Sequence, residues 1–326
     1  MYSDEKVDVK ENSIYNIDEN LLTILLSDRT TGKNILWATN MYESHGLNYS
    51  SSSQITVEQI TGRNGQVIKP RTKKSKQEQV KRIRDKGEVF TPSWVCNRQN
   101  NIADSSWFGI ENVFNKEKGN TWLTNKNKIL FPKGKTWVDY VKSKRLEIAC
   151  GEAPYLVSRY DTVTGEVIPP FDRIGLLDRK LRVISENVAT KDDWKKYAIE
   201  SYKSIYGYEW QGDSLLIARE NMLYTYIDYY LFEFNENPSI DDLTKIAEII
   251  SWNVFQMDGI KYVIPNSCKN ERFVELTLFG ENVIEKCCDG CKSNKLKKHN
   301  GIYCKTMNWD TNKPVKFINL LKKGIK

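Results

Sequence analysis

Short apolar runs, each ending in a turn or an acidic residue, are spaced along residues 145–260 of the chain. One run contains Leu146 and Ile148 and is followed by Gly151, which predicts a short buried strand that ends in a tight turn. A second run of apolar and aromatic residues ends in Glu209 and predicts another strand. Glycine lets a backbone approach a ligand closely, so the end of the first strand is a predicted ligand site.

Helical periodicity separates these strands. Helices are predicted over residues 153–160, 194–206, 215–227 and 239–250. Further short strands are predicted over residues 174–178, 253–258 and 315–321. Strands that alternate with helices are typical of an α/β fold with a parallel sheet, whose ligands bind at the carboxyl ends of the strands.

Changes in this pattern divide the chain into parts. Residues 1–70 are expected to form a small N-terminal extension, and residues 71–326 the main domain. Within the main domain, about fifty residues separate the glycine turn from Glu209, more than a compact crossover needs, so about 157–204 is interpreted as an insertion. A cysteine-rich element covers about residues 268–310.

Composition predicts a globular protein without a membrane span. Hydrophobic residues make up 40% and charged residues 28% of the 326 positions. No apolar run approaches the roughly 20 residues of a transmembrane helix, and the acidic, polar N-terminus is unlike a signal peptide. We therefore expect a cytoplasmic protein with reduced cysteines and no membrane partner.

Basic charge is concentrated in residues 63–86, which carry ten lysines and arginines against two acids. This excess of eight positive charges is larger than the net charge of +7 of the whole chain. Concentrated positive charge suits a phosphate backbone, so DNA is the predicted partner, with a solvated helix face as the alternative. The candidate DNA-binding residues are Lys73, Lys74, Lys81 and Arg82.

Cysteines crowd the C-terminal part of the chain with the spacing of a zinc site. The pattern C-x2-C-x7-H-x4-C supplies four soft ligands for tetrahedral zinc, namely Cys288, Cys291, His299 and Cys304. Cys268 and Cys287 are further candidates. Four protein ligands leave no position for water, so the predicted site is structural. Nearby lysines suited to phosphate are Lys292, Lys295, Lys297 and Lys298.

Three segments occur in an order that resembles a known family. They are Gly87-Glu88-Val89-Phe90-Thr91-Pro92, Glu147-Ile148-Ala149-Cys150-Gly151 and Ile205-Tyr206-Gly207-Tyr208-Glu209. Together they resemble the M subunits of restriction–modification systems, which methylate the amino group of adenine in DNA. The resemblance covers about residues 70–260.

The resemblance implies a Rossmann-like methyltransferase sheet with helices on both faces, and S-adenosylmethionine as the cofactor. It implies that Glu209 bonds the ribose hydroxyls and that Asp258 lies near the adenine ring. The implied cofactor-binding residues are Phe90, Thr91, Pro92, Glu147, Cys150, Gly151, Glu209 and Asp258. Asp178 is the alternative for the ribose: its spacing from the glycine turn favours it, whereas the Ala-Arg-Glu-Asn sequence that follows favours Glu209.

One part of the family pattern is missing. The family uses an Asn/Asp-Pro-Pro-aromatic loop to accept hydrogen bonds from the target amino group and to stack on a flipped base. No such sequence follows Asp258. Residues 168–171 are Ile-Pro-Pro-Phe, and an isoleucine side chain cannot accept a hydrogen bond. No catalytic residue is therefore assigned.

The expected function is that of an S-adenosylmethionine-binding, methyltransferase-like protein of a restriction–modification or related DNA-processing system. As an isolated chain it is expected to be catalytically incomplete, with a second restriction–modification subunit as its partner. The alternative is a non-enzymatic, zinc-containing DNA-binding module on a degenerate methyltransferase scaffold. A complete enzyme with an unrecognised acceptor loop is the third hypothesis.

Overall fold

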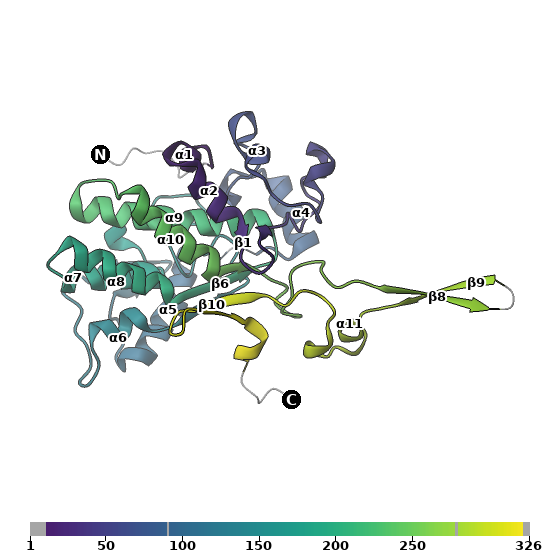
Figure 1. The fold of residues 1–326 in the computed structure, drawn as a ribbon. Helices are drawn as coiled ribbons and strands as arrows, with labels where there is room; N and C mark the ends of the chain where they lie inside the picture. Colours follow the sequence, from purple (N-terminus) through teal and green to yellow (C-terminus); the bar gives the residue numbers. More distant parts are fainter. Residues whose placement is uncertain (1–10, 90, 278–279, 322–326) are drawn as a thin grey trace.

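The computed structural model describes residues 11–89, 91–277 and 280–321. These residues form a mixed α/β body from which one long β-hairpin extends (Figure 1). No described helix has the length and apolar character that crossing a membrane requires. Phe90, one of the predicted cofactor-binding residues, lies outside the described residues.

A three-stranded parallel sheet lies inside the body. Its strand order is β5 (Arg145–Ile148), β6 (Ile205–Glu209) and β7 (Val254–Gln256). Parallel neighbours need long crossovers. Helices supply them: α7 (Leu176–Asn187), α8 (Lys191–Lys203), α9 (Gly212–Phe234) and α10 (Ile240–Asn253). The parallel α/β arrangement is confirmed, but three strands do not establish the larger Rossmann-like sheet, which stays a prediction.

Helices α8, α9 and α10 correspond to the helices predicted from periodicity over residues 194–206, 215–227 and 239–250. Ser239 caps α10 as predicted, because its side chain accepts a hydrogen bond from the backbone N–H of Asp242. α9 and α10 contact β6 and β7, and their apolar side chains form the main hydrophobic cluster.

The opposite face of the central sheet is covered by other residues. Tyr208 and Phe255 belong to a second hydrophobic cluster with Phe317, whose ring centroid lies 6.0 Å from that of Tyr208 and 5.5 Å from that of Phe255. Phe317 begins a short 3-10 helix, Phe317–Leu320, after the hairpin of β10 and β11. At Tyr208 and Phe255 the second face is therefore covered by Phe317 and the turn that it begins, and helices on both faces of the sheet stay a prediction.

The predicted strand over residues 315–321 is also corrected. β11 (Lys313–Lys316) pairs antiparallel with β10 (Lys305–Asn308) in a separate two-stranded sheet and does not join the central one. The residues after it form the 3-10 helix, because the Phe317 ring turns back onto the sheet face.

The burial pattern of β5 is the reverse of the predicted one. Leu146 is 43% exposed and Ile148 is 67% exposed, whereas Glu147 between them is only 8% exposed. Among the described strands β5 lies at the edge of its sheet, with β6 as its one neighbour. Glu147 turns inward because its carboxylate accepts hydrogen bonds from the backbone of the turn that follows.

The chain after β5 forms consecutive turns and not the predicted helix over residues 153–160. Gly151 has a φ of +53°, a conformation that favours glycine. Asp178, predicted to end a strand, instead lies in the first turn of α7, where its carboxylate accepts hydrogen bonds from Ser158 and from the backbone N–H of Gly175. A Cβ at Gly175 would lie 2.4 Å from the Leu156 carbonyl oxygen, so this close approach requires glycine.

The N-terminal residues share the main core. Helix α2 (Glu19–Leu26) contacts α9 and α10, and its four buried leucines join the main cluster. The other elements of this part are α1 (Glu11–Ile17), β1 (Ser27–Asp28), β2 (Lys33–Asn34) and α3 (Val57–Ile60). Residues 11–70 are thus packed on the same helices that cover the central sheet.

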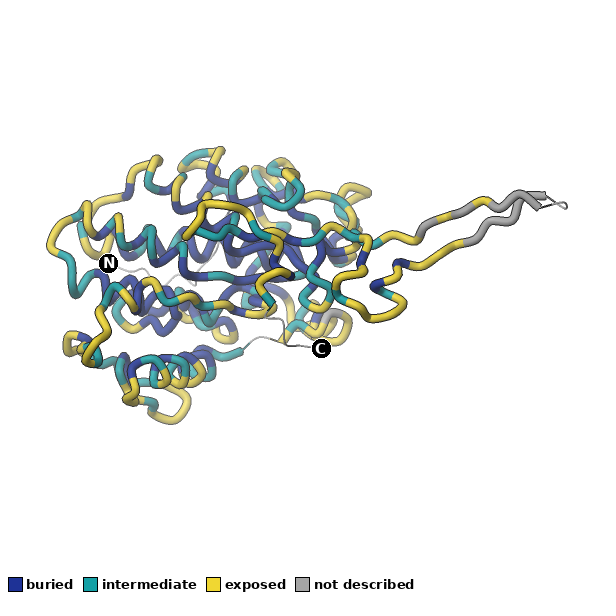
Figure 2. Tube along the Cα trace, turned by 60° about the horizontal axis from the view of Figure 1, so that its bottom comes forward, coloured by how far each residue is buried: buried dark blue, intermediate teal, exposed yellow. Residues whose placement is uncertain are grey.

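The remaining elements flank the body. They are α4 (Lys76–Lys86), α5 (Ser93–Phe108), β3 (Asn115–Lys118), β4 (Thr121–Thr124), α6 (Trp137–Lys142), β8 (Glu271–Thr277), β9 (Gly280–Lys286) and α11 (Asp289–Ser293). We call the β8–β9 hairpin the arm. It extends away from the body, in which the buried residues are concentrated (Figure 2).

Candidate functional site

A cavity of about 910 Å³ opens at the carboxyl ends of β5 and β6. The turn after β5 forms one part of its wall, and the first residues of α9 form another. The segment that joins α4 to α5 contributes a third part. The cavity therefore lies where ligands bind in open parallel sheets.

Five of the eight predicted cofactor-binding residues line this cavity: Thr91, Glu147, Cys150, Gly151 and Glu209. Pro92 immediately precedes α5 and is not a lining residue, and Asp258 lines a smaller cavity of about 180 Å³. Asp178 is fully buried within α7 and lines neither cavity. Of the two acids considered for the ribose, the structure therefore places Glu209 at the cavity.

Glu209 ends β6 and holds the glycine turn of β5 against it. Its carboxylate accepts a hydrogen bond from the Gly151 N–H at 2.9 Å. It also accepts hydrogen bonds from the N–H groups of Trp210 at 2.9 Å and Gln211 at 3.1 Å. Burial raises the pKa of Glu209, and these three hydrogen bonds oppose the rise.

Glu147 is a second buried carboxylate on the same wall. It accepts hydrogen bonds from the N–H groups of Tyr155 at 3.4 Å and Leu156 at 3.2 Å. Burial raises the pKa of Glu147 well above its usual range, and the charge of Glu209 raises it further. Within the described part of the chain, neither Glu147 nor Glu209 has a lysine or arginine as an ion-pair partner.

The cavity has a uniform sign of charge. The described acidic residues on its wall are Asp85, Glu88, Glu147, Glu152 and Glu209. No lysine or arginine is among the described lining residues. Glu88 is paired with Arg82 and Asp85 with Arg84, so Glu147, Glu152 and Glu209 are the wall acids without an ion pair among the described residues. Acids without a basic partner favour a cationic ligand over one that carries phosphates.

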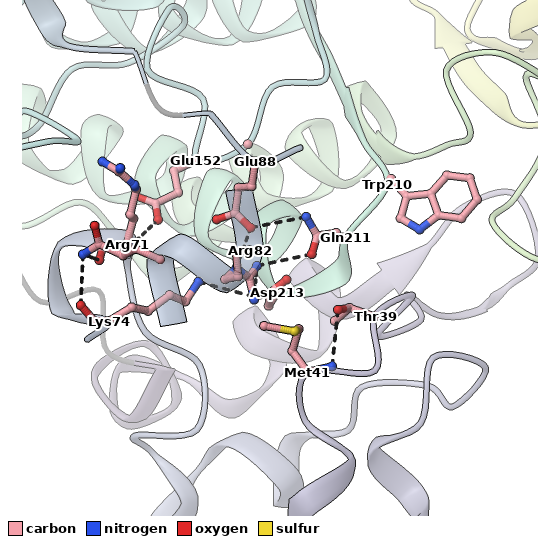
Figure 3. A network of polar contacts seen from close by, with 12 residues as sticks. Thr39, Met41, Arg71, Lys74, Arg82, Glu88, Glu152, Trp210, Gln211 and Asp213 are labelled. Carbon is pink, nitrogen blue, oxygen red and sulfur yellow. Dashed lines mark hydrogen bonds and ion pairs between the residues drawn. The ribbon is translucent and has the colours of Figure 1, made fainter. Parts of the chain in front are cut away.

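A buried ion-pair network attaches α4 to the start of α9 beside this wall (Figure 3). Asp213 in the first turn of α9 accepts hydrogen bonds from Arg82 Nη2 and from the Tyr42 hydroxyl, both at 2.7 Å, and Lys74 Nζ lies 3.5 Å away. Arg82 also pairs with Glu88 of the cavity wall. Burial by itself raises the pKa of Asp213, but Arg82 and Lys74 hold it far below its usual range.

This network corrects part of the predicted DNA-binding set. Lys74 is 8% exposed and Arg82 is 3% exposed, because both side chains neutralise Asp213 inside the protein. Neither is free to contact a phosphate backbone. Lys73 and Lys81 are exposed, so they alone of the four candidates remain available.

A second candidate site lies at the base of the arm, where three cysteines and one histidine converge. The four ligand atoms lie within 4.8 Å of one another and come from Cys268, Cys288, Cys291 and His299. The Nδ1 atom of His299 lies 3.7, 3.8 and 3.6 Å from the three Sγ atoms, in chain order. Zinc bonds of about 2.3 Å to sulfur and 2.0–2.1 Å to nitrogen in a tetrahedron require sulfur–nitrogen distances of about 3.6 Å. The residues could therefore hold a metal ion.

The fourth member of this cluster differs from the prediction. Cys304 lies in the second hydrophobic cluster, where its thiol lies 3.3 Å from the Gln256 carbonyl oxygen, and it is not part of the cysteine–histidine group. Cys268 takes its place, because the chain doubles back through the arm and brings residue 268 beside residue 288.

Burial raises the pKa of the Cys288 thiol, but hydrogen bonds lower it to about 6. The largest of these contributions comes from the Asn300 N–H.

Trp210, which sequence reasoning did not single out, lines both cavities. Its indole N–H donates to the Ala38 carbonyl at 2.9 Å, which fixes the ring between the two sites. Its position directly after Glu209 was the signal in the sequence that could have identified it.

The Ile-Pro-Pro-Phe segment, residues 168–171, does not line the larger cavity, and the carbonyl of Pro170 accepts a hydrogen bond from the Tyr229 hydroxyl.

Comparisons of the chain with protein-family models, with curated proteins and with solved structures find no match. The function is therefore argued from the two sites themselves.

Proposed function

We propose that the larger cavity binds S-adenosylmethionine, and that the chain is a methyltransferase-like component of a restriction–modification or related DNA-processing system. The observation that carries this proposal is the charge of the cavity wall. Five acids and no basic residue surround a glycine turn at the ends of parallel strands, among the described lining residues. The order of the three sequence segments supports the same conclusion, since all three contribute to this one cavity.

S-Adenosylmethionine suits this wall better than nucleotides with phosphates do. It carries a sulfonium and an ammonium group against one carboxylate, so it is a net cation. Phosphates are usually held by basic side chains or by the N-terminus of a helix. The turn at Gly151 is not followed by a helix, although the N-terminus of α9 does reach the wall. The preference for a cation therefore rests on the acids of the wall and on the absence of lysine and arginine among its described residues.

The buried carboxylates have complementary roles in this proposal. Glu209 accepts hydrogen bonds from the ribose hydroxyls, as the resemblance implies. Glu147 fixes the turn after β5 and contributes negative charge for the cationic end of the ligand. Trp210 offers an aromatic ring beside Glu209 where a flat adenine can pack.

Isothermal titration tests the proposal with three ligands. S-Adenosylmethionine should bind, S-adenosylhomocysteine should bind more weakly because it lacks the sulfonium charge, and ATP should not bind measurably. Tight binding of ATP with none of S-adenosylmethionine would overturn the proposal.

Gly151→Leu should abolish S-adenosylmethionine binding. Nothing lies within 4 Å of a Cβ built at Gly151, so the leucine side chain would extend into the ligand space. The positive φ adds a strain of about 1–2 kcal/mol, which the fold should tolerate. Gly119→Leu is the matched control, since Gly119 also has a positive φ with open space around it but does not line the cavity. Equal affinities of the two folded variants would remove the glycine turn from the site.

Methyl transfer is assigned to a complex with a second subunit. The described lining residues include no Asn/Asp-Pro-Pro-aromatic sequence, and Ile-Pro-Pro-Phe lies elsewhere. The outer side of β5, beside the cavity, has no neighbouring strand among the described residues. A partner that supplies the acceptor loop would therefore have access to the cofactor.

We further propose that the cysteine–histidine cluster holds a structural zinc ion. Three sulfurs and one nitrogen at nearly tetrahedral spacing match the donor set that zinc prefers. Because all four positions are protein ligands, the ion would stabilise structure and would not activate water.

Cys268→Ser and Cys304→Ser should differ in metal content. Wild-type protein purified without chelators should contain about one zinc per chain, since a tetrahedral site holds one ion. Cys268→Ser should lose most of it, because a ligand is removed, whereas Cys304→Ser should retain it. Elemental analysis by mass spectrometry measures the ratio. Zinc retained by Cys268→Ser and lost from Cys304→Ser would restore the ligand set predicted from the sequence.

The second candidate function is a non-enzymatic, zinc-containing DNA-binding module. The cysteine–histidine cluster and its surrounding lysines favour it. Failure of S-adenosylmethionine to bind a zinc-loaded, DNA-binding chain would select this function over the first.

A further inference from the structure

The four residues of the cysteine–histidine cluster bracket the arm. Cys268 lies just before β8 and Cys288 lies just after β9, so an ion at the cluster would tie the two ends of the hairpin together. Cys291 belongs to α11 and His299 follows the next 3-10 helix, so the same ion would also fix the chain that leaves the arm.

The described residues between Ile264 and Cys304 lie outside both hydrophobic clusters. Ile264 and Cys304 themselves belong to the second cluster. Polar contacts join the segments on either side of the arm, such as the Asn300 side-chain amide, which bonds both backbone groups of Lys269. Segments that cannot bury apolar surface commonly depend on a metal ion to order them.

The backbone at Gly290 approaches His299 of the cluster closely. A Cβ at Gly290 would lie 2.4 Å from the His299 backbone nitrogen and 2.6 Å from its ring. Only glycine permits this contact, which brings the helix of Cys291 against the histidine. The backbone around the cluster therefore has a conformation that brings its ligand residues together.

Positive charge surrounds the base of the arm. Lys292, Lys295, Lys297 and Lys298 are all exposed, and none of them forms an ion pair with another described residue. The acid in the same stretch, Asp289, lies 3.7 Å from Lys286. We call these four lysines the knuckle lysines.

We propose that zinc at this cluster clamps the base of the arm, and that the ordered unit binds the phosphate backbone of double-stranded DNA through the knuckle lysines. The strands of the arm carry four glutamates against one arginine and one lysine, so the arm itself is not assigned a contact with DNA. The knuckle lysines instead form an exposed cluster of four positive charges beside the metal site, which suits the phosphate backbone. The proposal rests on the zinc site proposed above and is independent of the cofactor cavity.

Fluorescence polarisation with a labelled 30-base-pair duplex of mixed sequence tests this interface. Four samples are compared over a series of salt concentrations. They are zinc-loaded wild type, wild type treated with a zinc chelator, a variant with the four knuckle lysines changed to glutamate, and a control with Lys116, Lys126, Lys128 and Lys133 changed to glutamate. The control residues are exposed and carry the same charge change on a different part of the body.

Zinc-loaded wild type and the control variant should bind with similar affinity. The knuckle variant should bind at least about 100-fold more weakly, and its slope of log affinity against log salt should be smaller by about 0.9 for each lost phosphate contact. Chelation should weaken binding similarly and should speed proteolysis within the arm. Equal losses in the knuckle and control variants, or equal binding with and without zinc, would overturn the proposal.

Titration of S-adenosylmethionine into the same samples separates this proposal from the cofactor site. The knuckle variant should keep its affinity for S-adenosylmethionine, because its substitutions lie outside the larger cavity. Binding of acidic proteins or anionic vesicles, but not of the duplex, would assign the lysines to another partner and would also overturn the proposal.

Discussion

Asp213→Asn is expected to lower the free energy of unfolding by about 3–5 kcal/mol, the cost of leaving a buried charge unpaired. Asp213 is fully buried and neutralises Arg82 and Lys74, which are almost as deeply buried. Asparagine keeps the shape of the side chain but not its charge. Urea unfolding followed by circular dichroism at neutral pH measures the change.

The pH dependence of stability should change in the same variant. The pKa of Asp213 is lower in the folded protein than in the unfolded chain, so its contribution is fully present above the unfolded value of about 3.9. That contribution is lost as the pH falls toward the folded value. Asp213→Asn should therefore show a shallower loss of stability in acid than the wild type.

Asp310→Asn is the matched control for Asp213. Asp310 pairs with Lys144 at 2.7 Å, but its side chain is 73% exposed, and exposed pairs contribute little. Its stability should stay close to that of the wild type. If the two variants unfolded at the same urea concentration, the buried network would have no special role in holding α4.

Glu209→Gln is expected to lower the affinity for S-adenosylmethionine by about 100-fold or more. In the proposed complex, the substitution removes two charge-assisted hydrogen bonds to the ribose, each worth roughly 1.5–3 kcal/mol. The new amide group is itself a donor and would face the N–H groups of Gly151, Trp210 and Gln211. Isothermal titration measures the loss, and Glu117→Gln, on β3 outside the cavity, is the control.

The affinity of the wild type should also depend on pH. Burial raises the pKa values of Glu147 and Glu209, so in mild acid part of the cavity charge is neutralised by protons. A cationic ligand should therefore bind more tightly as the pH rises and these carboxyls ionise. Glu209→Gln should flatten this dependence. An affinity that is insensitive both to pH and to this substitution would argue against a role for Glu209 in the site.

Sequence patterns within one or two helical turns were sufficient to predict several helices and strands. The Ser239 cap and the helical periodicity after it predict α10, and the apolar run that ends in Glu209 predicts β6. Hydrogen bonding of a cap and the period of a helix depend on residues within one or two turns of each other. The convergence of Thr91, Glu147 and Glu209 on one cavity followed from the order of these elements.

The burial of side chains and the partners of charged residues were determined only by the tertiary structure. Leu146 and Ile148 form an apolar strand pattern but are exposed, because burial depends on whether another element covers an edge strand. Lys74 and Arg82 belong to a basic run, yet their charges are neutralised by Asp213, which is 139 and 131 residues away in the chain.

The same distinction explains the ligand set of the metal site. The sequence alone determined that a cysteine–histidine cluster with zinc spacing occurs near the C-terminus, because Cys288, Cys291 and His299 are close along the chain. The fourth ligand depends on how the arm folds back, and this brings Cys268 to the cluster while Cys304 enters the core. Sequence spacing predicts which residues come into contact only when they are close along the chain. For residues far apart in the sequence, the packing of distant elements determines which of them meet.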